Sequence, residues 1–522
     1  MSYTVTPGGS IKAHLFATFH PTDHDVKEDH AEESFAHQMD SCAYDYRVGW
    51  GTASRLKNPL SLARMPTGEH PTVSTGSVAD RTVLRMPKLR TGTRNRHLIE
   101  DENGIAFFIA GVCPQNLIHT STPDQMDVYF AHRQTEHFNF AWVAVNGFSS
   151  NDTSGKPATN PVDALGNSML RSGTSWNPHN LNPSYVKSVD AMVRSAANHR
   201  FYLFLDPYSV AYNPGSIGFD PSQHSLDEMQ QWGEFWGSRY QNYSHVNFAL
   251  GNDRLDGPQA DAVAKGLQKY MPDRLMTTDW IGGPRDWSSD ETGPRKFYDA
   301  DHRWINFNGW YQYHAPQWAS WTHYNMVDPV MPTCIFETFY EACGYGNPKP
   351  NPTIPQMMRE QVWAAVLNGG SGFGILGSPD CIDDPMKWLG KTPGLEQAQH
   401  CTTFFASRRW YDLIPDWSHV FLTSQSGTPG KDDYTYVSAA VTNDGSLGVC
   451  YYPGRSGTGF QLTVNLSKMG GGSGKLQARW YDPTNGSYKT IGQFANSGSH
   501  SFTTPDANSK GATDWVLVFE RN

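Results

Sequence analysis

The chain has 522 residues, a length typical of about two to four domains or of one large barrel with additional segments. Its formal net charge of −10 gives no basic surface for nucleic acid, so we expect no nucleic-acid partner. No run approaches the roughly 18 consecutive apolar residues of a membrane span, and the N-terminus lacks the pattern of a secretory signal. We therefore expect no membrane partner, and the location stays open between the cytoplasm and an assembly such as a phage particle.

The cysteine and aromatic content further limits the class of protein to which the chain can belong. The chain has seven Cys, an odd number, without any CxxC pair, and most of them lie in apolar segments as buried free thiols do. We expect a reducing environment during folding and neither a disulfide framework nor a zinc site. Aromatic residues make up 13% of the chain, which weakly favours carbohydrate because aromatic faces stack on sugar rings.

Residues 1–95 show little periodicity. They contain a His-rich and acidic stretch followed by a Pro- and Arg-rich one. Possible ligands for a metal are His20, Asp23, His24, Asp25, His30 and His37, but no ligand spacing such as HExxH occurs, and we predict no metal and no cofactor. The segment is interpreted as an irregular arm that packs on the main domain or holds the chain in a homo-oligomer or larger assembly.

From about residue 97, apolar β-rich runs alternate with stretches of helical spacing. The predicted strands are 105–111, 138–145, 201–207, 246–252, 275–280, 304–310, 332–338 and 371–377. Eight such units predict an α/β fold, a (β/α)8 TIM barrel, over residues 96–415. The rival, a doubly wound open sheet, is less favoured because no GxGxxG follows the first strand.

The pattern of apolar and polar residues changes again near residue 416. Short alternating runs, separated by Gly, Asn and Ser turns, predict an antiparallel β-sandwich over residues 416–522. The sequence therefore predicts three parts, which are the N-terminal arm, the barrel and the sandwich.

Chemistry in a (β/α)8 barrel lies where the strands end, at the C-terminal face. Two carboxylates, Asp253 and Glu337, follow the predicted fourth and seventh strands, which lie nearly opposite each other in a ring of eight. Glycoside hydrolysis uses such a pair, one to protonate the leaving oxygen and one to attack the anomeric carbon or activate water. Other candidates for substrate binding are Asn146, Asp206, Asn252, Asp279, Trp280, Asn308, Trp310 and Glu341.

Each candidate also has a structural interpretation. A carboxylate at a strand end is often a cap for the next helix, and Asp253 with Arg254 could form a turn and a salt bridge. Glu341 is a rival to Glu337 for the same role, or it forms a structural ion pair. Trp176, Trp280, Trp310 and Tyr311 could stack on sugars or belong to the core, and the segment 147–182 could be a lid over the mouth or a surface excursion. Neither a GxSxG nor a P-loop motif is present.

Seven segments in one order resemble a known family. They include "HFNFAWVAVNGF", "VNFALGNDR", "LMTTDW" and "IFETFYE". Together they resemble the apiosidase-like glycoside hydrolases, which combine a (β/α)8 barrel with a C-terminal β-sandwich that carries a collagen-binding label. The resemblance covers about residues 97 to 520. It implies that Asp253 is the acid/base and Glu337 the nucleophile.

Two strand ends depart from the family pattern. The first strand ends in Gly111-Val112-Cys113-Pro114-Gln115, where the family has an acid and an aromatic residue, and the segment "GGSGFGILGS" lacks the family's His and Tyr. We therefore predict a glycoside hydrolase, retaining in mechanism, that cleaves a complex polysaccharide and acts on a sugar other than the family's. The alternative is a non-catalytic glycan-binding or structural protein, for example a virion-associated component, on a modified barrel.

Overall fold

The structure is a computed structural model. It describes residues 84–146, 160–209, 220–251, 257–278, 280–281, 303–311, 317, 324, 330–337, 341, 354–374, 384–424, 433–470 and 475–521. The chain divides into two compact units, Met1–Arg64 and Met65–Asn522, and every described residue belongs to the second. The charged, His-rich part of the predicted N-terminal arm lies outside the described residues.

Short parallel strands form the barrel, as the sequence predicts. Six of them form one sheet in the order β11-β3-β4-β5-β6-β7, and β8, β9 and β10 form a second sheet. Their bounds are β3 (Ile109–Val112), β4 (Phe140–Ala144), β5 (Tyr202–Asp206), β6 (Val246–Ala249), β7 (Met276–Thr277), β8 (Trp280–Ile281), β9 (Asn308–Tyr311), β10 (Thr333–Glu337) and β11 (Gly372–Phe373). The predicted fifth strand, 275–280, is thus divided into β7 and β8.

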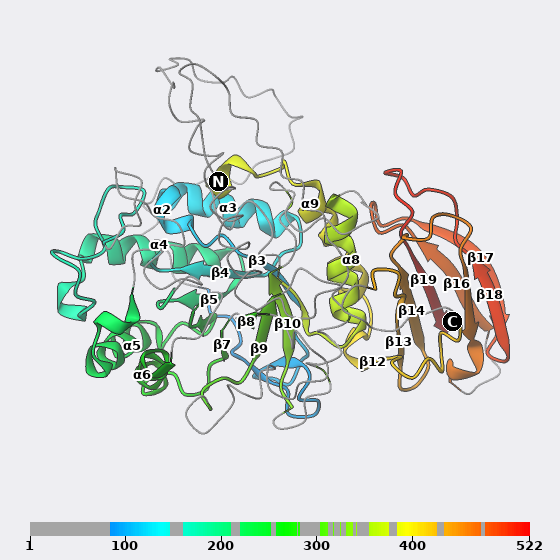
Figure 1. The fold of residues 1–522 in the computed structure, drawn as a ribbon, viewed down its shortest axis with the longest axis horizontal. Helices are drawn as coiled ribbons and strands as arrows, with labels where there is room; N and C mark the ends of the chain where they lie inside the picture. Colours follow the sequence, from blue (N-terminus) through cyan, green and yellow to red (C-terminus); the bar gives the residue numbers. More distant parts are fainter. Residues whose placement is uncertain are drawn as a thin grey trace, which may run out of the picture. The chain divides into compact units, whose positions relative to one another are not determined.

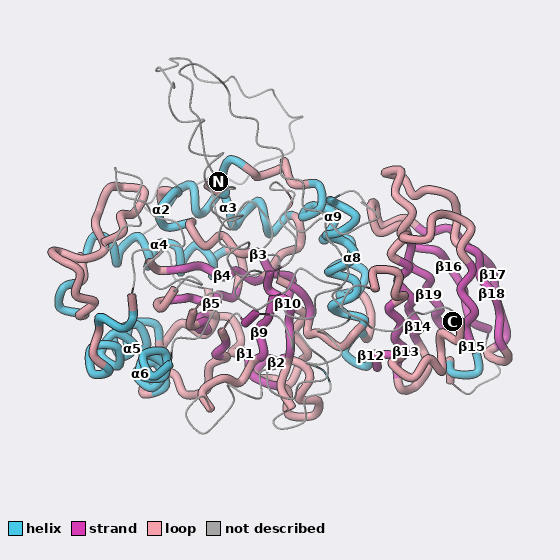
Figure 2. The backbone as a smooth tube through the Cα atoms, in the orientation of Figure 1, coloured by secondary structure: helices cyan, strands magenta, loops and turns pink. Residues whose placement is uncertain are grey.

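Backbone hydrogen bonds join the two sheets at both seams and close the ring. Asn306 N donates to Met276 O at 3.1 Å, which connects the β9 side to β7. At the other seam, Gly374 N donates to Ile335 O at 2.7 Å, which connects the β11 side to β10. Figure 2 shows these strands with the helices around them.

The helices lie outside the strands (Figure 1). Their bounds are α2 (Leu117–Thr120), α3 (Pro123–Thr135), α4 (Pro183–Asn198), α5 (Leu226–Tyr240), α6 (Gly257–Gln268), α8 (Ile354–Leu367) and α9 (Pro393–Ala406). Local sequence explains where several begin, since Thr122 and Ser225 form capping boxes at α3 and α5. Helix α4 begins in the same way, because Asn182 caps it and Pro183 is its first residue.

Aromatic side chains fill the interior of the barrel. Phe204 on β5 contacts the rings of Trp142, Phe307 and Phe336, with centroids 5.5 to 6.1 Å apart. Glycines on neighbouring strands make room for these rings. A Cβ atom at Gly309 would lie 2.7 Å from Cδ2 of Phe336, a distance that real Cβ atoms essentially never show.

A hairpin covers the end of the barrel where the strands begin. It pairs β1 (Leu89–Thr91) with β2 (Ile99–Asp101), so the predicted irregular segment 1–95 is wrong for its last part. Thr91 Oγ1 donates to Asn306 O at 2.8 Å, just before β9. Tyr202 at the start of β5 donates from its hydroxyl to Pro87 O at 2.8 Å. The hairpin therefore lies at the far end of the barrel from the carboxyl ends of the strands.

The C-terminal part is an antiparallel β-sandwich, as predicted. One sheet has the order β12-β13-β14-β19-β16-β17, and β15 pairs with β18 in the other. The bounds are β12 (Leu413–Pro415), β13 (Ser438–Thr442), β14 (Leu447–Tyr452), β15 (Gln461–Asn465), β16 (Lys475–Tyr481), β17 (Tyr488–Ala495), β18 (Ser499–Thr503) and β19 (Trp515–Arg521). Since β12 pairs with β13, the chain enters this sheet before residue 416. Helix α8 contacts β12, β13 and β14 (Figure 1).

Candidate active site at the carboxyl ends of the barrel strands

The chain turns directly after β6. Gly251 has a φ of +86°, in the left-handed region that glycine adopts without strain. Its N–H donates to Tyr208 O at 3.1 Å, and its carbonyl accepts from the hydroxyl of Thr278 at 3.4 Å. The strand end is therefore held from both neighbouring strands immediately before Asn252 and Asp253. These two residues, and Asp279, lie outside the described residues.

Asp206 ends β5 and is fully buried, with 0% of its surface exposed. One carboxyl oxygen accepts from Tyr208 N at 2.9 Å, while Oδ2 makes no hydrogen bond of normal geometry. Burial raises the pKa of Asp206 to about 7, although the nearby Tyr208 and Gly251 N–H groups and the Trp142 indole favour the charged form. Asp206 thus lies inside the barrel, directly beside the backbone that leads to Gly251.

Asn146 links the segments that follow β4 and β5. Its Nδ2 donates to Ser209 O at 2.9 Å, and its Oδ1 accepts from Ser209 N at 3.2 Å. The residue is buried at 2% exposure. The structure therefore brings Asn146, Asp206 and Gly251 together into one bonded group at the ends of three adjacent strands, and their predicted contact with substrate stays a prediction.

Glu337 is the last residue of β10 and pairs with Tyr311 at the end of β9. The register shifts between Ile335, which pairs with Trp310, and Glu337, so β10 carries one extra residue at Phe336. Bulges of this kind are frequent at barrel rims and next to active sites, where they change which residue occupies a given position. Trp280 is described only as part of β8, where it pairs with Trp310.

Two predicted substrate ligands, Asn308 and Trp310, face away from the barrel interior. Gly309 packs against Phe336 inside the barrel, and neighbouring residues of a strand point to opposite faces, so Asn308 and Trp310 face the helix layer. Trp310 belongs to the core there, with 1% exposure, and its indole donates to Thr333 Oγ1 at 2.8 Å. This orientation does not favour the predicted contact of these two residues with substrate, which stays a prediction.

Trp176 is a core residue, which is the structural one of the two interpretations that the sequence left open. It is buried at 2% exposure, and its ring lies 4.9 Å from that of Trp232. Residues 160–182 of the predicted rim segment are described and include buried positions such as Met169 and Leu170 as well as the exposed run 171–175, whereas 147–159 lie outside the described residues.

Glu341 has a structural role in addition to any contact with substrate. Its two carboxylate oxygens accept from Gly394 N at 2.6 Å and from Leu395 N at 3.2 Å, at the start of α9. Burial raises its pKa to about 7, against the lowering effect of these two N–H groups. The predicted ion pair for Glu341 is thus replaced by binding to a helix N-terminus.

The sequence analysis missed two hydroxyl residues at the end of β7. Thr277 Oγ1 accepts from Gly309 N at 2.9 Å, inside the ring, and Thr278 holds the carbonyl of Gly251. The sequence signal for these residues is the Thr-Thr pair before Asp279. Their contacts could not be predicted from it, because the contact with Gly309 depends on the position of β9. His119 has a structural role, since its Nδ1 bonds Val162 O at 2.8 Å and burial lowers its pKa to about 4.

Among the described residues, no three His, Cys, Asp or Glu side chains could together hold a metal ion. No helix in the described part of the chain is long and apolar enough to cross a membrane. Four of the seven cysteines are described, and all four are buried thiols that form no disulfide: Cys113, Cys334, Cys401 and Cys450.

Known structures share this architecture. A protein described as a glycoside hydrolase matches with a TM-score of 0.64 and 19% sequence identity, over 83% of this chain and 97% of its own. A glycoside hydrolase of family 5 from Bacteroides vulgatus matches with a TM-score of 0.63 and 19% identity, over 83% of this chain and 93% of its own. At this identity the likeness shows the fold. No curated protein matches the chain in sequence.

Family models cover both domains. Residues 414–520 match the model described as "putative collagen-binding domain of a collagenase". The model described as "Apiosidase-like, catalytic domain" matches residues 93–412, which is more than half of the chain. With its closed barrel of parallel strands and its C-terminal β-sandwich, the chain belongs to the apiosidase-like family.

Proposed function

We propose that the chain is a retaining glycoside hydrolase that cleaves a glycosidic bond in a complex polysaccharide. The observation that carries this proposal is the position of two strand ends in the closed ring. Strand β6 and its turn at Gly251 lead into Asp253, and β10 ends at Glu337, with β7, β8 and β9 between them. This arrangement, together with membership of the apiosidase-like family, supports Asp253 as acid/base and Glu337 as nucleophile.

The proposed reaction has two steps. In the first, the acid form of Asp253 protonates the leaving oxygen while the Glu337 carboxylate attacks the anomeric carbon, which gives a glycosyl-enzyme. In the second, Asp253 takes a proton from water as the water releases the sugar from Glu337. Retention requires the two carboxyl groups to be about 5–5.5 Å apart.

Substrate contacts are proposed for the polar and aromatic residues next to these two carboxylates. Asn252, Asp279 and Trp280 follow β6 and β7 directly in the sequence. Asn146 and Asp206 end the neighbouring strands and are bound to the backbone there. We propose that these two residues hold the backbone at the base of the site. Hydroxyl groups of the sugar contact them only if the loop residues above leave them accessible.

The end of the first strand favours a sugar other than the family's usual one. Cys113 and Gln115 are buried there, at 1% and 2% exposure, and neither is an acid or an aromatic residue. The screen should therefore extend beyond an aryl apioside to aryl glycosides of other pentoses and hexoses.

The test is hydrolysis by the wild type and by Glu337→Gln and Asp253→Asn, with exposed Glu102→Gln in the hairpin at the other end as the control. We expect Glu337→Gln to abolish hydrolysis. In Glu337→Gly, which leaves room for a small anion, azide should restore cleavage of an aryl glycoside by forming a glycosyl azide of inverted configuration. NMR of the first product should show a retained anomer. Undiminished hydrolysis by Glu337→Gln would exclude the nucleophile assignment. Binding of glycans without any hydrolysis would instead favour the non-catalytic alternative.

A further inference from the structure

The carboxylate of Glu341 occupies the N-terminus of α9, a helix of 14 residues that lies far along the chain. Its two oxygens bind the N–H groups of Gly394 and Leu395, which have no partner within the helix. A negative charge at this position also interacts favourably with the helix dipole, and hydrogen bonds from backbone N–H to a carboxylate are among the stronger ones.

Helix α9 is built to receive this carboxylate. Its own N-cap residue, Thr392, makes no capping hydrogen bond, and its buried hydroxyl is unpartnered. Gly394 leaves the space that the carboxylate needs, because a Cβ atom there would lie 3.1 Å from Cδ of Glu341 and 2.8 Å from Cγ of Met358. Three separate features of the helix start therefore agree with one role for Glu341.

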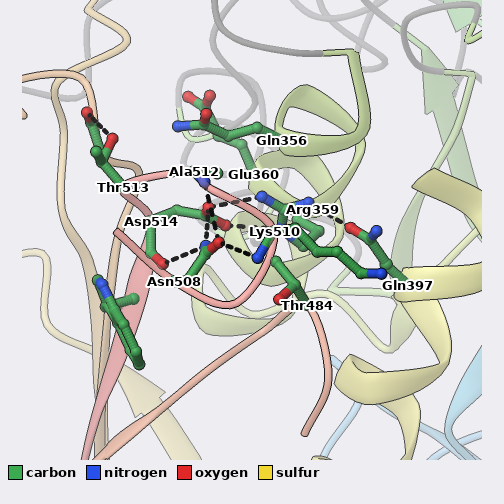
Figure 3. A network of polar contacts seen from close by, with 12 residues as sticks. Gln356, Arg359, Glu360, Gln397, Thr484, Asn508, Lys510, Ala512, Thr513 and Asp514 are labelled. Atoms are coloured by element: carbon green, nitrogen blue, oxygen red, sulfur yellow. Dashed lines mark hydrogen bonds and ion pairs between the residues drawn. The ribbon is translucent and has the colours of Figure 1, made fainter. Parts of the chain in front are cut away.

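The helix itself is held firmly. Leu395, Ala398 and Cys401 are buried at 0 to 1% exposure, and α9 packs along α8. Arg359 on α8 donates to Gln397 at 2.5 Å and forms a two-point ion pair with Asp514 of the C-terminal domain, as Figure 3 shows. The start of α9 is thus an anchor fixed by both domains.

Glu341 follows Glu337 by four residues, which limits the distance between their Cα atoms to about 14 Å. We propose that Glu341 is a positioning residue that ties the chain after β10 to the anchor at α9 and thereby fixes the Glu337 end of the strand. The inference rests on the proposed role of Glu337 as nucleophile. It assigns Glu341 to the support of the reaction rather than to contact with the sugar, because both of its oxygens are engaged by the helix.

The first experiment compares Glu341→Gln with Glu396→Gln. The amide introduced at position 341 would present a donor to one of the two N–H groups, so the tie is weakened. Glu396 lies in the same helical turn, and its replacement removes the same charge without touching the bonds to Gly394 or Leu395. We expect Glu341→Gln to lower kcat about tenfold to a hundredfold with KM changed less than about threefold. Glu396→Gln should change kcat less than about twofold.

A second variant separates positioning from plain helix stability. Adding Thr392→Asp to Glu341→Gln supplies a local cap for α9, which should recover the thermal stability of the helix and of the protein. It does not tie the chain after β10, so kcat should stay low. Recovery of kcat together with stability would overturn the proposal, because Glu341 would then act only as a helix cap. Should Glu341→Gln fail to fold alone, the capped double variant gives the same kcat measurement.

Hydrogen exchange provides a readout that does not depend on activity. The Glu341→Gln variant with the Thr392→Asp cap should exchange faster than the wild type in the peptide 331–341, while exchange in α9 stays near the wild-type rate. Unchanged exchange in 331–341 would overturn the inference. If the wild type hydrolyses no glycoside, the proposed function fails, and exchange alone then decides whether Glu341 anchors the segment.

Discussion

Asp206 is the buried carboxyl group at the end of β5, and its protonation depends on the fold. Its pKa is about 7 in the folded chain against 3.8 as the ordinary value, because burial disfavours the charged form. The folded chain therefore binds this proton more tightly than the unfolded chain. The resulting stabilisation is fully present below about pH 4 and is lost as the pH rises through about 7.

This pH dependence predicts the effect of Asp206→Asn. The amide keeps an oxygen for Tyr208 N and cannot ionise, so the variant should gain up to about 4 kcal/mol over the wild type between pH 4 and pH 8, at about 1.4 kcal/mol per pKa unit. Urea unfolding at pH 5 and pH 8 measures it. Glu341 and Glu360, which also have a pKa of about 7, are present in both proteins, so the difference isolates Asp206. Equal pH dependence in the two proteins would show that Asp206 is ionised throughout.

The left-handed turn at Gly251 gives a second prediction for a single residue. Alanine in that conformation costs about 1–2 kcal/mol. Gly104, in the hairpin at the opposite end of the barrel, has a φ of +79° and open space around it, so Gly104→Ala should cost a similar amount. Only Gly251→Ala should also lower kcat, because it precedes Asn252 and Asp253. An equal loss of kcat in both variants would attribute the effect to stability alone.

At the scale of elements, apolar runs of the sequence predicted the barrel strands in order, because strands covered on both faces are apolar throughout. Because such a strand is apolar on both faces, its sequence does not show which residues face the barrel interior and which face the helices. Trp310 and Asn308 were predicted at the mouth of the barrel, yet the pleat of the strand directs them outward. The register shift in β10 also changes which of its residues pair with those of β9. Neither the division of β7 from β8 nor the pairing of Leu89–Thr91 with β2 has a periodic signal. Contacts between distant segments, such as Glu341 with α9, leave no local pattern.

The interior of the barrel depends on glycines that face aromatic rings. A Cβ atom at Gly309 would come within 2.7 Å of both Phe336 Cδ2 and Thr277 Oγ1. We expect Gly309→Ala to destabilise the barrel by about 1–3 kcal/mol through overpacking. Phe336→Leu makes room, so the double variant should be more stable than the sum of the single changes predicts, by about 0.5–3 kcal/mol. Chemical denaturation of the four proteins of this cycle measures the coupling, and strict additivity would contradict it.

At the scale of the whole molecule, two buried ion pairs join α8 to the C-terminal sandwich. Arg359 and Asp514 are 1% and 0% exposed at their side chains, and Arg455 lies 2.5 Å from Glu360. Tyr451 and Asn508 also donate to Asp514, so its carboxylate is fully surrounded by donors. A sandwich attached in this way is part of the support of the barrel, because α8 lies between β10 and β11 in the chain.

This attachment predicts that barrel and sandwich unfold together. Asp514→Asn leaves the guanidinium of Arg359 buried without its counter-charge, which should cost about 3–5 kcal/mol. The exposed pair of Arg409 with Asp444 provides the matched control, since those side chains are 58% and 44% exposed and Arg409→Met should leave the stability nearly unchanged. Calorimetry should show one transition for the two domains in the wild type. In Asp514→Asn that transition should move to lower temperature or split into two, and an unchanged single transition would mean that the domains do not depend on this pair.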